Sequence, residues 1–143
     1  MSDELYHQAI VTLARDKRHA GHLEAASGAA TITNPLCGDR VRVEVTVADD
    51  SIDAVAHTVR GCLLCKAAAA MIGQAAPGCT PAAARSVAGQ VSAMLKTNGA
   101  VPDGAWALVA AFTPVINHKS RHDCVDLPFQ ALVAALNDAE TKT

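Results

Sequence analysis

The chain has 143 residues, enough for one domain with its own hydrophobic core, and we expect residues 1–143 to form a single domain. Twelve basic and fourteen acidic residues give a net charge of −2, which excludes the concentrated basic surface of a nucleic-acid-binding protein. No apolar run approaches the roughly 20 residues that cross a bilayer, and the polar start is unlike a signal peptide. We therefore expect a cytoplasmic protein without a nucleic-acid or membrane partner.

Small side chains dominate the apolar half of the composition. The chain contains 30 alanines but only four aromatic residues, which are Tyr6, Trp106, Phe112 and Phe129. A core of small aliphatic groups favours close helix packing over a large apolar ligand pocket. Five cysteines are an odd number, and thiols stay reduced in the cytoplasm, so metal or thiol chemistry is a better hypothesis than a disulfide framework.

The predicted elements fall into a helix, a group of strands and a group of helices. Valines at every second position from 41 to 47 indicate the clearest strand, with one face apolar. Helical spacing predicts a first helix over 3–17, and weaker strands are expected over 29–33 and 52–60. Four helices follow, over 62–76, 80–96, about 104–112 with a disturbance at Pro114, and about 120–138 with a break near Pro128. This order predicts an α+β fold, a three-stranded antiparallel sheet with helices packed on one face.

Three cysteines lie at the ends of predicted elements, where sites are usually assembled. Cys37 lies in a turn before the clearest strand, Cys62 opens a helix where the dipole lowers a thiol's pKa, and Cys124 lies one turn after Arg121. Any one of them, taken alone, is more often a small buried hydrophobic residue. Together they make a candidate thiol or metal site.

The other two cysteines have less to suggest a role. Cys79 lies in a turn between helices and is expected to be structural. Cys62 and Cys65 have CxxC spacing, which is a weak signal for a single pair. Cys65 therefore stays open between structural filler, a spare ligand, a sulfur acceptor and a resolving thiol.

The histidines offer fewer candidates. His57 falls in the last predicted strand and is expected to pack, not to ligate. His118 and His122 flank Arg121 near Cys124, so either could reach a metal bound there.

Taken together, these features resemble the U-type iron-sulfur cluster assembly proteins, namely IscU, SufU and the N-terminal domain of NifU. The residues that carry the resemblance are Tyr6, Asn34-Pro35 with Cys37-Gly38-Asp39, Gly61-Cys62, and Cys124 with Leu127. The resemblance covers nearly the whole chain. The chain departs from the family's usual pattern at Cys65, His57 and Val59, where the family usually has serine, an aromatic residue and glycine, respectively.

Within this family the chain is most similar to the SufU branch. The 62 positions from Cys62 to Cys124 leave room for the extra segment of that branch, and Arg121 stands three residues before Cys124 as it does there. The Leu-Pro-Pro-Val-Lys chaperone-recognition motif of the IscU branch is missing, and Asp123 replaces the histidine before the third cysteine. The resemblance therefore does not imply an IscU-type chaperone partner.

The resemblance implies a metal site of Cys37, Asp39, Cys62 and Cys124. It implies sulfur acceptance from a cysteine desulfurase and delivery to acceptor proteins or later assembly proteins. The leading interpretation is a zinc-dependent sulfurtransferase in which Cys124 or Cys37 accepts the sulfur and Arg121 supports the reaction. The second is a non-enzymatic scaffold that holds iron in a transient [2Fe-2S] cluster on the three cysteines. A remote third is a thiol-disulfide protein using Cys62 and Cys65, which leaves Cys37 and Cys124 unexplained.

Overall fold

A computed structural model describes residues 8–36 and 38–142 of the chain. The expectations for Tyr6 and Cys37 fall outside these residues. The described elements, in chain order, are α1 (Gln8–Arg15), β1 (Gly28–Thr33), β2 (Arg40–Ala48), β3 (Ser51–Arg60), α2 (Leu63–Ala75), α3 (Pro81–Thr97), the 3₁₀ segments η2 (Gly104–Asn117) and η3 (Lys119–Arg121), and α4 (His122–Thr141). The α+β prediction is confirmed.

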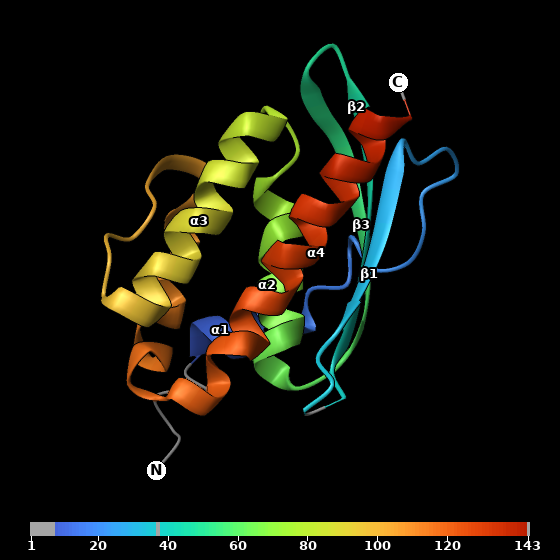
Figure 1. The fold of residues 1–143 in the computed structure, drawn as a ribbon. Helices are drawn as coiled ribbons and strands as arrows, with labels where there is room; N and C mark the ends of the chain where they lie inside the picture. The colour runs from blue at the N-terminus through green and yellow to red at the C-terminus, as the bar shows by residue number, and fades with distance from the viewer. Residues whose placement is uncertain (1–7, 37, 143) are drawn as a thin grey trace.

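The sheet is antiparallel throughout and has the order β1-β2-β3. Val43 of β2 stands opposite His57 of β3, and the neighbouring valines of β2 are buried as their alternation predicts. Figure 1 shows the helices on one side of this sheet, with α2 and α4 next to it and α3 farther away. The strands thus bury one face against helices, and the other face exposes Arg40, Thr58 and Arg60 to solvent but buries Glu44.

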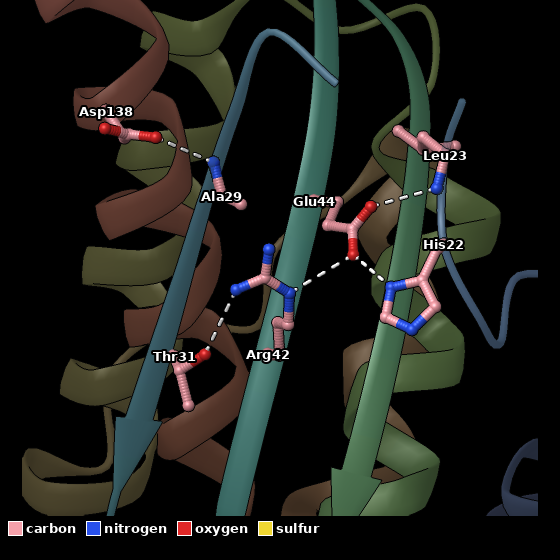
Figure 2. Close-up of polar contacts among 7 residues, drawn as sticks. All are labelled: His22, Leu23, Ala29, Thr31, Arg42, Glu44 and Asp138. Carbon is pink, nitrogen blue, oxygen red and sulfur yellow. Dashed lines mark hydrogen bonds and ion pairs between the residues drawn. The ribbon is translucent and has the colours of Figure 1, made fainter. Parts of the chain in front are cut away.

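Small residues let α2 and α4 approach the sheet and each other. Four consecutive alanines, residues 67–70, are buried on α2. At Gly28 of β1, a β-carbon would lie 2.4 Å from the carbonyl oxygen of Ala135 on α4, so only glycine fits there. The Asp138 carboxylate also accepts a hydrogen bond of 2.9 Å from the Ala29 N–H, as Figure 2 shows. This contact ties the edge strand β1 to α4.

The interhelical turn and the start of α3 agree with the prediction. The Thr80 hydroxyl accepts the Ala83 N–H at 3.1 Å, and Pro81 occupies the first helical position. The helix ends at Thr97, and the following C-cap residue Asn98 has a left-handed φ of 57°.

The last third of the chain differs from the prediction in two ways. The segment from Gly104 to Asn117 is a 3₁₀ helix and contains Pro114, where an ordinary helix was expected as far as Phe112. The break expected near Pro128 is wrong, because α4 runs through it without interruption. Pro128 lacks the N–H that would bond to the Cys124 carbonyl, so the helix continues with one hydrogen bond fewer.

Within the described residues, no helix combines the length and the apolar character that a membrane span requires.

Candidate metal centre

The candidate site lies where the sheet meets the first turns of α2 and α4. Asp39 directly precedes β2, Cys62 follows β3 and caps α2, and Cys124 lies in the first turn of α4. One ligand atom from each of these three residues lies within 4.8 Å of the other two. Three segments that are far apart in sequence therefore bring two sulfurs and one carboxylate together. Cys37 lies outside the described residues, so its place in the site stays a prediction.

The turn before β2 is held by backbone and side-chain contacts that do not use the Asp39 carboxylate. The Gly38 N–H donates to the Asn34 carbonyl at 2.8 Å, and the Asn34 side-chain oxygen accepts the Leu36 N–H at 2.9 Å. Gly38 has a φ of 78°, which favours glycine. Because Asn34 closes the turn, the Asp39 side chain is left to face the two cysteines.

Gly61 makes the close approach possible. A β-carbon at this position would lie 3.1 Å from the Asp39 carboxyl carbon and 3.2 Å from the Cys65 β-carbon. Sequence reasoning noted Gly61 only as the neighbour of Cys62. A glycine at a strand end, directly before a candidate ligand, was the available signal that another group comes close there.

The two thiols share a proton. A hydrogen bond from the Cys124 thiol lowers the pKa of Cys62 to about 6, although burial acts in the opposite direction. The same bond raises the pKa of Cys124, and burial and the negative charge on Cys62 add to this effect. Without a cation the site therefore holds one thiolate and one thiol.

Two further groups stabilise the thiolate on Cys62. The backbone N–H groups of Cys65 and Leu64, in the first turn of α2, lower its pKa, as expected at a helix N-terminus. The positive charge of Arg121 lowers the pKa of both cysteines. Arg121 thus lies close enough to act on both sulfurs, while its supporting role in the reaction stays a prediction.

The remaining candidates lie outside the convergent ligand group of the described residues. The ring of His122 is buried, and its Nε2 lies 3.0 Å from the Ile116 carbonyl oxygen, so the imidazole is held by η2. His118 and His122 are both outside the group of convergent ligand atoms. His57 is buried in β3, as expected for a packing residue.

Cys65 and Cys79 are also outside this group. Cys65 is completely buried on α2, although its position next to Gly61 places it just behind the site. The Cys79 thiol donates to the Ala75 carbonyl at 3.3 Å in the turn after α2, as expected for a structural residue.

The donor set fits a soft divalent cation. Without a cation, the two closely spaced thiols cannot both ionise, whereas a bound cation compensates the charge of both thiolates. A carboxylate oxygen is a harder and more exchangeable ligand than sulfur. The residues present can therefore hold zinc or cluster iron.

Comparison with known proteins places the chain in a family. The family model described as "NifU-like N terminal domain" matches residues 5–143. The zinc-dependent sulfurtransferase SufU of Bacillus subtilis is 30% identical over 132 residues, which cover 91% of this chain and 88% of that protein. The iron-sulfur cluster assembly scaffold protein IscU 1 of Archaeoglobus fulgidus is 29% identical over 76 residues. That match covers 53% of this chain and about half, 50%, of the relative's length.

Solved structures agree with this result. The crystal structure of the N-terminal part of a nitrogen-fixing NifU-like protein from Brucella abortus is 30% identical, with a TM-score of 0.94 and coverage of 99% of this chain and 98% of that chain. A SUF-system protein from Fervidobacterium islandicum AW-1 shares the fold at 24% identity, with a TM-score of 0.87 and coverage of 95% and 99%. The chain is similar to proteins named IscU and SufU and belongs to the family of NifU-like N-terminal domains.

Proposed function

We propose that this chain, as one domain over residues 1–143, accepts sulfur from a cysteine desulfurase at a zinc site and passes it to later proteins of iron-sulfur cluster assembly. The observation that carries the proposal is the convergence of Asp39, Cys62 and Cys124 within 4.8 Å. The similarity to a zinc-dependent sulfurtransferase over most of both chains supports the choice of zinc. Cys37, two residues before Asp39, is the proposed fourth ligand.

A carboxylate among the ligands suits a metal site that must release one ligand during sulfur transfer. Four thiolates around zinc make a closed structural site, whereas a carboxylate ligand can be released and rebound more easily. Asp39 is the proposed exchangeable ligand. When bound, zinc keeps its sulfur ligands deprotonated at neutral pH, which is the form that attacks sulfur.

Sulfur transfer then needs one thiolate of this chain and one persulfide of the donor. The thiolate of Cys124 or Cys37 attacks the outer sulfur of the donor persulfide, so one S–S bond forms as another breaks. The donor sulfur leaves as a thiolate, and the persulfide proton stays with the transferred sulfur. The exchange needs no external oxidant or reductant. Arg121 stabilises the negative charge on the attacking sulfur, because its own charge lies close to Cys62 and Cys124.

A second candidate is a scaffold on which a [2Fe-2S] cluster is assembled on Cys37, Cys62 and Cys124 and then released. The named relative that favours it is the scaffold IscU 1, over about half of the length of each chain. The thiol-disulfide alternative is weaker, because it uses only Cys62 and Cys65 and leaves Cys37 and Cys124 without a role.

Elemental analysis with a visible absorption spectrum distinguishes the two main candidates. The protein is purified without oxygen and compared with its Cys124→Ser variant. About one zinc per chain and a colourless protein, with loss of zinc in the variant, supports sulfur transfer. Iron with acid-labile sulfide and a brown colour contradicts the zinc proposal and favours the scaffold.

A further inference from the structure

The solvent-facing side of the sheet carries arginines at directly opposite positions. Arg40 of β2 pairs with Arg60 of β3 in the antiparallel register, so the two side chains lie on the same face. Like charges placed directly opposite each other destabilise a sheet. The chain has a net charge of −2, so this pair is a local concentration of positive charge and not part of a generally basic surface.

On the same face, Arg42 is paired with an acidic side chain, whereas Arg40 and Arg60 are not. Arg42 lies 3.2 Å from the Glu44 carboxylate and also contacts the Thr31 hydroxyl at 3.4 Å (Figure 2). Glu44 further accepts the Leu23 N–H at 2.9 Å and pairs with the His22 ring, so its oxygens are fully engaged. Burial raises the pKa of Glu44, but these hydrogen bonds outweigh burial and lower it overall. Neither Arg40 nor Arg60 has a side-chain hydrogen bond or ion pair with any described residue.

The unpaired arginines form a shallow hollow beside the candidate metal centre. The hollow has a volume of about 160 Å³ and is lined by His22, Thr31, Arg40, Arg42, Thr58 and Arg60. Arg40 follows Asp39 directly, and Arg60 is separated from Cys62 only by Gly61. The hollow therefore lies at the same end of the sheet as the candidate metal centre.

An apolar side chain at the same end of the sheet adds to the surface. Leu36, in the turn that precedes Asp39, is 92% exposed, although large apolar groups usually bury themselves. Protein interfaces combine a few apolar contacts with charged groups at the rim, and arginine is enriched in them. The combination favours a protein over a small anion as the occupant.

We propose that Arg40 and Arg60 together bind carboxylate side chains of an acidic segment on the sulfur-donating protein. This inference rests on the proposed function, because it names the surface that the donor uses to approach the same site. Two guanidinium groups on one face can each form paired hydrogen bonds with a carboxylate, which a lysine pair cannot. The repulsion between the two arginines is relieved only when the acidic segment is bound.

The proposal predicts opposite effects on stability and on binding. Arg60→Gln removes the cross-strand repulsion, so the melting temperature of the free protein should rise, by about 2 °C. The double variant Arg40→Gln/Arg60→Gln should bind the organism's own cysteine desulfurase roughly tenfold more weakly than the parent at low salt. The parent's affinity should also fall more steeply with added salt than the double variant's.

Arg85→Gln is the matched control, because it removes the same charge from α3, where Arg85 already pairs with Glu140 at 2.8 Å. Its affinity for the desulfurase should match the parent's. Binding is measured by calorimetry on the full-length proteins, and Arg60→Lys tests whether the guanidinium group matters beyond its charge. Arg60→Lys should bind the desulfurase more weakly than the parent and more tightly than Arg60→Gln.

Three results would count against the proposal, and they are distinguishable. If the parent binds the desulfurase and the double variant binds equally well, the arginine surface is wrong while the proposed function stands. If Arg60→Gln lowers the melting temperature, an acidic group of this chain already pairs with it, and the surface is not free. If the parent neither binds nor stimulates the desulfurase, the proposed function fails and this inference fails with it.

Discussion

The Cys124 thiol donates a hydrogen bond to the Cys62 sulfur and so joins the first turn of α4 to the first turn of α2. The two residues are separated by most of the helical half of the chain, and each lies beside buried core residues, including Leu64 and Val125. The candidate site therefore lies at the margin of the apolar core, with Cys124 inside the buried cluster and Cys62 packed against it. Stability and metal binding should respond differently to substitutions in the two places.

Removing the metal should lower the melting temperature without unfolding the protein. The apolar core joins the sheet to α2, α3 and α4 and is large enough to fold unaided. A ligand present at 100 times its dissociation constant adds about 2.7 kcal/mol of stability, which chelation removes. Far-ultraviolet circular dichroism before and after chelation checks this, and complete loss of the helical signal would show that the core depends on the metal.

Asp39→Ala should speed metal exchange while leaving the fold intact. The Asp39 carboxylate is the only hard donor in the described ligand group, and the turn before β2 is closed by Asn34 without it. The rate of metal exchange is followed with a chromophoric chelator. The control is Asp123→Ala, because Asp123 is exposed and lies outside the ligand group. If Asp39→Ala lowers the melting temperature but leaves metal content, exchange and desulfurase stimulation at parental values, Asp39 is a turn residue and not a ligand.

Two glycine-to-alanine substitutions should differ in their effect on metal affinity. Gly61→Ala places a methyl group 3.1 Å from the Asp39 carboxyl carbon, so it should displace this ligand and weaken metal affinity by about tenfold or more. Gly89→Ala on α3 meets no atom within 4 Å and should stabilise the protein by about 0.5–1 kcal/mol without changing metal affinity. Equal metal affinities of the two variants would remove the role given to Gly61.

Stability should depend on the charge of Asp16 at the end of α1. Hydrogen bonds from the Arg18 side chain and backbone hold the pKa of Asp16 well below its ordinary value of 3.8, and Gln74 of α2 adds another at 2.6 Å. A lowered folded-state pKa means that the stabilisation is complete above the unfolded-state pKa and is lost as the pH falls toward the folded-state pKa. Asp16→Asn should therefore cost about 1 kcal/mol from pH 5 to 7, and the difference should shrink below about pH 4. Thermal melts across this range check it, and a difference that grows in acid would reverse the assignment.

The sequence predicted those parts of the fold that depend on local patterns. Alternating valines and turn residues located β2 and β3, and Thr80-Pro81 located the start of α3. The effect of Pro128 was not predictable, because packing of α4 against β1, β2 and α2 outweighs one lost hydrogen bond. The 3₁₀ geometry of η2 was missed for a related reason, since its apolar spacing suits either helix type.

The residues of the candidate site were predictable from the resemblance to a known family, but their contacts were not. Resemblance to the family selected Asp39, Cys62 and Cys124 before any geometry was known, and the structure brings their ligand atoms together. The shared proton between the cysteines and the opposed pair Arg40 and Arg60 depend on helix placement and on strand register. Neither is visible in a linear pattern.

Sulfur acceptance is the central claim, and one measurement tests it most directly. The zinc-loaded protein is incubated with the cysteine desulfurase and cysteine, its thiols are blocked, and peptide mass spectrometry locates any added sulfur atom. We expect one additional sulfur on Cys124 or Cys37, and none on the buried Cys65 or on Cys79. A protein that binds zinc and the desulfurase but carries no additional sulfur on either Cys124 or Cys37 would contradict the proposed transfer.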